Sequence, residues 1–255
     1  MKTLIKNGLV VDPANLVQTH LNLLLEDGKI VAVTEEEPEA DRVIDAAGKV
    51  VAPGFIDIHM HEDPVKDDKI QFCIFDAMLR MGVTTAVGGN CGINVYDPVK
   101  YLDLLERDGA PVNVMMFAGH QYYREAAGAL DKYSQVTEEQ RKMMKKELEE
   151  ALEAGCVGIS YGLRYVPGTG REEFLDTASC CQKEHRLISA HVRDDEERVF
   201  GAVAEVAEAG KIFDIPVEIS HIGSMAGFGQ MEQLLKQVDA YLSHRFSGQC
   251  RVELR

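Results

Sequence analysis

Six short apolar runs, each followed by a segment long enough for a helix, constrain the fold of this 255-residue chain more than any other feature. The runs are VAPGFIDIH (51–59), VTTAVGGNC (83–91), PVNVMMFAG (111–119), CVGISYG (156–162), RLISAHV (186–192) and PVEISHI (216–222). Runs that are apolar on both faces fit buried parallel strands, in either a barrel or a doubly wound sheet. Strand–helix alternation predicts right-handed βαβ units.

The helical segments between the runs carry their own end signals. The clearest is 137–155, in which Thr137 and Gln140 form a capping box and Gly155 follows the last turn. Residues 231–242 carry an apolar stripe at helical spacing, which indicates packing and not a cofactor site.

Residues 1–50 are predicted to form a small β module, the N-terminal part of a β-sandwich. Their partly alternating apolar runs are typical of short antiparallel strands. Tight turns are expected between these strands at Asn7-Gly8, Asp27-Gly28 and Ala47-Gly48.

Reactive side chains gather where the predicted strands end, and this favours a barrel. They are His59, His61, Cys91, His191 and His221. A (β/α)8 barrel places its active site at that end of its strands, and no GxGxxG follows the first strand to support a dinucleotide fold. Because only six units are present, we expect an α/β fold with an incomplete TIM-like barrel over 51–245 and an atypical tail over 246–255.

Charge and cysteine usage narrow the class of protein. A formal net charge of −15 argues against partners such as nucleic acid and anionic membrane surfaces. No stretch approaches the roughly 20 apolar residues of a membrane helix, and the N-terminus meets Asn7 and Asp12 too early for a signal peptide. The six cysteines form no CxxC pair. We therefore expect a cytoplasmic protein.

The sharpest motif is the pair His59 and His61 at the end of the first strand. Side chains at i and i+2 of a strand point to the same side, so both imidazoles could bind one metal ion. The apolar run that leads into the pair, introduced by Pro53-Gly54, strengthens this interpretation.

The segment that contains these two histidines resembles a motif of a known family. PGFIDIHMH (53–61) resembles the first-strand motif of the amidohydrolase superfamily, whose members are metal-dependent hydrolases on (β/α)8 barrels. Four further blocks, in the family's order, resemble its D-aminoacylase (N-acyl-D-amino-acid deacylase) branch: GGNCG (88–92), GISYGLRYVPG (158–168), HVRDDEE (191–197) and EISHIGSM (218–225).

The resemblance implies a set of metal ligands. Cys91, His191 and His221 would hold one zinc ion tightly, and His59 and His61 would bind a second, weaker metal near Cys91. A thiolate with two imidazoles suits zinc and leaves a position for water, whose pKa the metal would lower.

Other residues have less specific roles. Asp57 is predicted as a partner of a ligand or as a plain structural aspartate. Arg193 and Tyr165 lie in the matching blocks, where each could contact substrate or be structural. For Glu62 and Asp63, the sequence favours a solvated loop position or support of the metal ligands over the role of a general base.

The chain also departs from the family pattern. No catalytic residue is assigned, because the family's aspartate lies at the end of an eighth strand and the only aspartate after His221 is Asp239, in a helical segment. Gly223 stands where a D-aminoacylase usually has a cationic residue for the substrate carboxylate. These departures predict a C-terminally truncated chain and leave D-specificity open.

The resulting hypothesis is a metal-dependent hydrolase that cleaves a non-peptide C–N amide bond, as in an N-acyl amino acid, by metal-activated water. One alternative is a truncated, inactive metal-binding fragment, and another is a cyclic amidase or deaminase. The expected partners are a small-molecule amide substrate and further copies of the chain, as a homo-oligomer. The sequence leaves the number of copies open.

Overall fold

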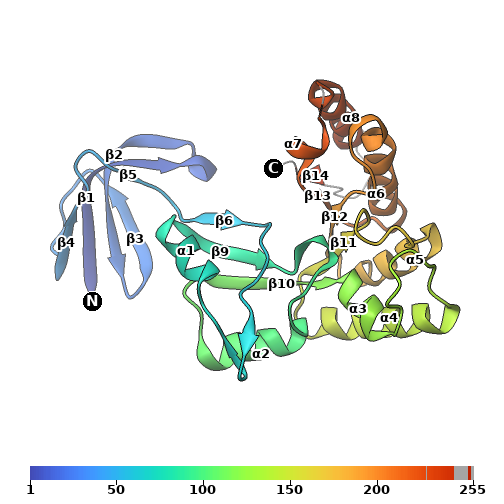
Figure 1. The fold of residues 1–255 in the computed structure, drawn as a ribbon. Coiled ribbons are helices and arrows are strands. Elements are labelled where there is room, and N and C mark those ends of the chain that lie inside the picture. Colours follow the sequence, from blue (N-terminus) through green and yellow to red (C-terminus); the bar gives the residue numbers. More distant parts are fainter. Residues whose placement is uncertain (228, 244–251, 254–255) are drawn as a thin grey trace. The chain divides into compact units, whose positions relative to one another are not determined.

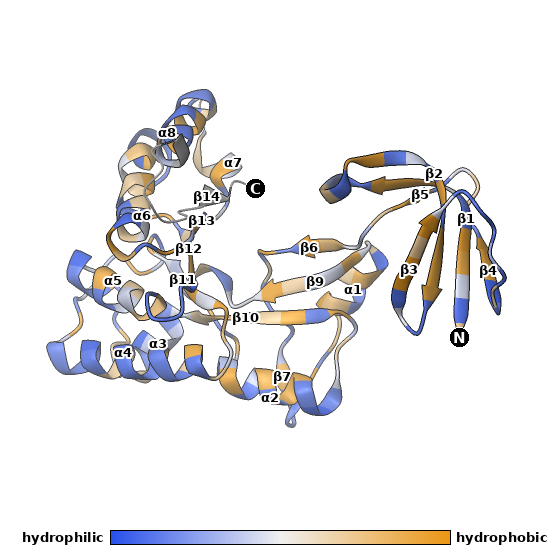
Figure 2. Cartoon of the chain, turned by 180° about the vertical axis from the view of Figure 1, so that it is seen from behind, coloured by the Kyte–Doolittle hydropathy of each residue, from blue (hydrophilic) through white to orange (hydrophobic). Residues whose placement is uncertain are grey.

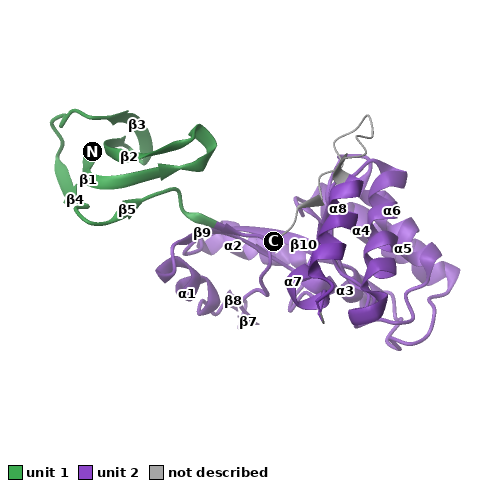
Figure 3. Cartoon of the chain, turned by 90° about the horizontal axis from the view of Figure 1, so that it is seen from above, with its two compact units in different colours: residues 1–55 green, residues 56–255 purple. Residues whose placement is uncertain are grey.

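The computed structural model describes residues 1–227, 229–243 and 252–253, which fall into two compact units, Met1–Phe55 and Ile56–Arg255 (Figure 3). The strands are β1 (Lys2–Asp12), β2 (Val17–Glu26), β3 (Lys29–Thr34), β4 (Arg42–Asp45), β5 (Val50–Val51), β6 (Phe55–Asp57), β7 (Val65–Lys66), β8 (Lys69–Ile70), β9 (Val83–Gly88), β10 (Asn113–Gly119), β11 (Gly158–Gly162), β12 (Leu187–His191), β13 (Val217–Ile219) and β14 (Val252–Glu253). The α-helices are α1 (Ile74–Arg80), α2 (Pro98–Asp108), α3 (His120–Ala126), α4 (Glu138–Glu153), α5 (Arg171–Ala178), α6 (Val199–Phe213), α7 (Ile222–Met225) and α8 (Met231–Ser243).

The first unit is a five-stranded sheet of mixed direction. The antiparallel pairs β1–β2 and β2–β3 agree with the sequence, but β4 and β5 pair with β1 in parallel. The acidic connection after β3 carries the chain back to the free edge of β1, so that β4 runs in the same direction as β1. Asn7-Gly8 is also not a turn, because Asn7 takes a positive φ at an irregularity inside β1, which continues to Asp12.

The second unit is built on a curled parallel sheet, the incomplete TIM-like barrel that the sequence predicts (Figure 1). Six of its strands, in the order β13-β12-β11-β10-β9-β6, are the six apolar runs. Because neighbouring strands are parallel, their carboxyl ends meet at one edge of the sheet.

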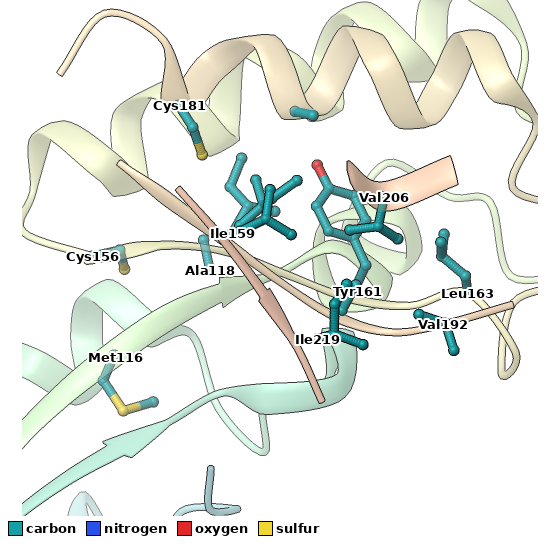
Figure 4. Packing of buried hydrophobic residues seen from close by; sticks show 14 of the residues in the cluster. Met116, Ala118, Cys156, Ile159, Tyr161, Leu163, Cys181, Val192, Val206 and Ile219 are labelled. Carbon is teal, nitrogen blue, oxygen red and sulfur yellow. The ribbon is translucent and has the colours of Figure 1, made fainter. Parts of the chain in front are cut away.

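One hydrophobic core joins the sheet to its helices. Met116, Ile159, Tyr161 and Val206 are among its fully buried members, contributed by strands β10 and β11 and by helix α6 (Figure 4). Strand β9 is largely apolar, whereas helix α4 carries mostly polar residues and buries only Met144, Leu148, Ala151 and Leu152 (Figure 2). The core therefore fixes the sheet on which the carboxyl-end residues are displayed.

Helix boundaries follow the signals in the sequence. Thr137 and Gln140 form the reciprocal capping box at the start of α4, and Gly155, at φ 118°, follows its end. The stripe in α8 is buried through Leu234 and Val238, so it packs as predicted.

Of the tail predicted over 246–255, only Val252 and Glu253 lie within the described residues. They form β14, which pairs in parallel with β13 and extends the sheet by one strand. In the described part of the chain, no helix combines the length and apolar character needed to cross a bilayer.

Candidate metal centre

The five histidine and cysteine residues singled out in the sequence come together at the carboxyl edge of the parallel sheet. His59 and His61 follow β6, Cys91 lies in the turn after β9, His191 ends β12 and His221 follows β13. They form two groups that share the thiol: His59, His61 and Cys91, and Cys91, His191 and His221. Within each group, one donor atom from each residue lies within 4.8 Å of the others.

The spacing of these donor atoms suits a four-coordinate ion. Cys91 Sγ lies 3.5 Å from His59 Nε2, 3.4 Å from His221 Nε2 and 4.0 Å from His191 Nδ1. Zn–S and Zn–N bonds at a tetrahedral angle place sulfur and nitrogen about 3.5 Å apart. The donor set and its spacing therefore fit zinc without a large rearrangement.

Two of the candidate ligands have unusual backbone geometry. Cys91 has φ 57° and His221 has φ 54°, in the left-handed region that costs an L-residue about 1–2 kcal/mol. Gly89 and Gly92 on either side of Cys91 are also left-handed, and a Cβ at Gly92 would lie 2.8 Å from the backbone nitrogen of Gly162. The GGNCG segment thus folds into a tight turn that aims the thiol inward.

Burial sets the protonation states at this centre. Burial, followed by repulsion from the neighbouring imidazoles, lowers the pKa of His59 to about 4. Burial and the nearby His221 likewise lower the pKa of His191 to about 4, and burial lowers that of His221. For Cys91, burial and the negative charge of Glu218 raise the pKa to about 11. Near neutral pH, therefore, the three imidazoles are neutral and ready to bind, while the thiol keeps its proton.

Unpaired nitrogen atoms argue against ordinary core histidines. Within the described residues, His59 Nδ1 and His191 Nε2 are buried without a hydrogen-bond partner. Buried polar atoms in proteins are nearly always hydrogen-bonded. Each ring therefore has one nitrogen that no hydrogen bond within the described residues satisfies.

Zinc binding to Cys91, His191 and His221 should release one proton at about pH 7.5. The imidazoles, whose pKa values burial lowers from the ordinary 6.5, are deprotonated there, whereas the Cys91 thiol must lose its proton to become a ligand. The association constant should therefore rise about tenfold per pH unit between about pH 7 and 8. Competition with a chelator of known affinity measures this slope; a flat profile would contradict the assigned protonation states.

Two carboxylates after His61 anchor the loops around the centre. Glu62 is buried and accepts hydrogen bonds from the backbone N–H groups of Gly89 (2.8 Å) and Val95 (2.9 Å). Asp63 is also buried and accepts from three backbone N–H groups at the start of α1. Loop solvation, one of the roles predicted for this pair, is therefore wrong, because both side chains are shielded from water.

The three supporting residues have different surroundings. Asp57 accepts from the backbone N–H of His59 at 2.9 Å. The Tyr165 hydroxyl lies 2.9 Å from His191 Nδ1, and its side chain is partly exposed beside the centre. Arg193 instead forms a bidentate ion pair with Glu205 and donates to the backbone carbonyl of Thr169. These contacts favour the structural role over contact with substrate.

A second cluster of buried polar side chains connects α3 to α5. Glu173 Oε1 accepts from His120 Nε2 at 2.9 Å and from Arg124 Nε at 3.1 Å. All three side chains are almost fully buried. Arg124 also donates to the carbonyls of Ala129, Asp131 and Ser134, so this cluster ties the loop before α4 to α5.

Comparisons with known proteins agree with this architecture. Residues 42–164 match the model of an amidohydrolase family. D-aminoacylase of Alcaligenes xylosoxydans xylosoxydans is 29% identical over 95% of this chain and 55% of its own length. A crystal structure of D-aminoacylase superposes with a TM-score of 0.85 at 28% identity, covering 95% of this chain and 56% of that one.

A third relative was crystallised with a metal ion. N-acyl-D-glutamate deacylase of Bordetella bronchiseptica, in complex with zinc and a phosphonate that mimics the tetrahedral intermediate, superposes with a TM-score of 0.82 at 28% identity. The alignment covers 94% of this chain and 56% of that protein. The chain thus spans about half the length of the relatives that it matches.

Proposed function

We propose that this chain provides the metal-binding part of a zinc-dependent hydrolase of N-acyl amino acids, because its residues 42–164 match an amidohydrolase family and it is similar to D-aminoacylase and N-acyl-D-glutamate deacylase. The observation that carries the proposal is the convergence of one thiol and four imidazoles at the carboxyl edge of the sheet. A small-molecule amide is the proposed substrate.

The proposed roles follow from the surroundings of each side chain. Cys91, His191 and His221 would hold one zinc ion, and His59 and His61 would complete a second, weaker site that shares the thiol. When bound, zinc would supply a Lewis acid that polarises the scissile carbonyl and lowers the pKa of a water molecule. Tyr165 presents a hydroxyl next to His191, from which it could donate a hydrogen bond to the substrate.

The group that would carry a proton to the leaving amine is not assigned. Asp239 is unsuited to this role, because it lies on the exposed side of α8. Gly223, two positions after His221, leaves room for a side chain, since a Cβ there would meet nothing closer than 3.9 Å. Without a cation at Gly223, the stereochemistry of the substrate is left to experiment.

The chain should bind zinc and hydrolyse N-acyl amino acids only in the zinc-loaded form. The assay would test N-acetyl D- and L-amino acids together with a cyclic amide, before and after chelation and with zinc restored. Turnover of the acyclic amides that zinc restores supports the proposal. Zinc binding without turnover of any substrate would favour the alternative of an inactive fragment, and turnover of the cyclic amide alone would favour a cyclic amidase.

A further inference from the structure

We propose that Asn90 is a positioning residue that sets the mutual placement of the metal-binding side chains, an inference that rests on the proposed function. Asn90 directly precedes Cys91 in the turn after β9 and is fully buried. It contacts chain segments that flank the candidate ligands on other strands, as its hydrogen bonds show.

The amide nitrogen of Asn90 connects strand β9 to the segment that follows β6. Nδ2 donates to the carbonyl of Val87 at 2.8 Å and to that of Ile58 at 3.1 Å, with Met60 O a further 3.5 Å contact. Ile58 and Met60 are the neighbours of His59. One side chain therefore fixes the segment that carries His59 against the turn that carries the thiol.

The amide oxygen extends the same connection to the other strands. Ser189 Oγ, on β12 two residues before His191, lies 3.2 Å from Asn90 Oδ1 and 2.6 Å from Glu218 Oε2. Ser220, the residue before His221, donates to the same carboxylate oxygen at 2.8 Å. A buried polar network beneath the centre thus reaches a residue next to, or two positions from, each of His59, Cys91, His191 and His221.

The orientation of the amide is determined by its surroundings. If the oxygen and nitrogen of Asn90 were exchanged, an oxygen would face the carbonyl oxygens of Val87 and Ile58 without any hydrogen between them. An aspartate would face the same conflict, because an ionised carboxylate only accepts hydrogen bonds. The site therefore requires a hydrogen-bond donor that faces the carbonyls of Val87 and Ile58, which neither an ionised aspartate nor an alanine supplies.

Backbone geometry explains why such a network is needed. Cys91 and His221 both hold left-handed conformations that L-residues disfavour. Such conformations persist only where the surrounding structure determines them strongly. Asn90 supplies that constraint beside Cys91, and the link through Ser189 and Ser220 extends it to the backbone before His221.

The test compares the wild-type chain with Asn90→Ala and Asn90→Asp. Both variants should bind zinc about 10- to 100-fold more weakly, the range seen when groups that orient metal ligands are removed. In the cobalt-loaded proteins, the thiolate-to-cobalt absorption band should weaken or shift. Affinity would be measured by competition with a chelator, and folding by circular dichroism.

The matched control is Asn22→Ala. Asn22 is a second buried asparagine, which also donates to two backbone carbonyls and accepts from a backbone N–H, but in the first unit. Its loss should leave the zinc affinity and the cobalt spectrum unchanged. If Asn90→Ala does not fold, Ser189→Ala leaves the contacts of Asn90 with Val87 and Ile58 in place. It removes the contacts of Ser189 with Asn90, Glu218 and Ser220, and it should still weaken zinc binding about tenfold.

The outcomes separate the two proposals. If the wild-type chain binds zinc and folded Asn90 variants, or Ser189→Ala in their place, bind it equally well with an unchanged cobalt spectrum, the positioning role alone is overturned. If the wild-type chain binds no zinc, the proposed function and this inference fail together. A selective loss in the Asn90 variants, absent from Asn22→Ala, supports the inference.

Discussion

Replacing Cys91 by alanine should weaken zinc binding about 100- to 1,000-fold. Four-ligand zinc sites in small domains have apparent binding free energies of about 10–16 kcal/mol, which corresponds to about 2.5–4 kcal/mol for each ligand. Cys91 belongs to both candidate groups, so its loss affects both of them at once. Competition with a zinc chelator measures the change, and any zinc-dependent hydrolysis should fall with it.

Cys156→Ala is the control for this substitution. Cys156 is fully buried in the hydrophobic core (Figure 4), so its replacement also removes a buried thiol. It should lower the free energy of unfolding without changing the zinc affinity. Equal zinc affinities for Cys91→Ala and the wild-type chain would show that the thiol is not a ligand.

Replacing Glu173 by alanine should lower the free energy of unfolding by about 3–5 kcal/mol. The substitution leaves the guanidinium of Arg124 buried without its carboxylate, and an uncompensated buried charge costs that much. His120 loses its partner in the same step. Urea unfolding followed by circular dichroism gives the change, provided that the transition has a single step.

The neighbouring residue provides the control for this experiment. Glu172 also forms an ion pair with an arginine, Arg141, but its side chain is 88% exposed. Exposed pairs contribute about 0–1 kcal/mol, so Glu172→Ala should change stability by less than 1 kcal/mol. Similar losses in the two variants would mean that burial does not strengthen the Glu173 pair.

Much of the second unit could be predicted from periodicity. The six apolar runs became the six adjacent parallel strands, because a strand that is apolar on both faces has few other environments in which to be buried. The same topology brings the carboxyl ends together, which explains why residues as distant in sequence as His59 and His221 lie near one thiol.

Other features depend on long-range pairing that local patterns do not specify. The glycines at Asn7-Gly8 and Asp27-Gly28 gave similar turn signals, yet only the second is a hairpin turn, because β1 has partners on both of its edges. Arg193 lies in the HVRDDEE block, where the sequence left substrate contact and a structural role open, but its guanidinium is paired with Glu205 on α6.

Two polar residues in the sequence indicate the buried polar network next to the candidate metal centre. Ser189 and Glu218 interrupt runs that are otherwise apolar. A polar residue inside a buried strand needs a polar partner, so each such interruption predicts a second polar group nearby. The identity of that partner, which here includes Asn90, depends on the packing of separate strands and could not be read from any one run.

The distances along the chain between the grouped side chains have a consequence for biosynthesis. Cys91 and His221 are 130 positions apart, and a ribosome that adds 5–20 residues per second needs roughly 6–26 s to cover that interval. His191 is added after the first 100 of these positions and His221 only at the end, whereas His59 and His61 have already been synthesised. The group formed by Cys91, His191 and His221 can therefore assemble only after β13, the strand that precedes His221, has been synthesised.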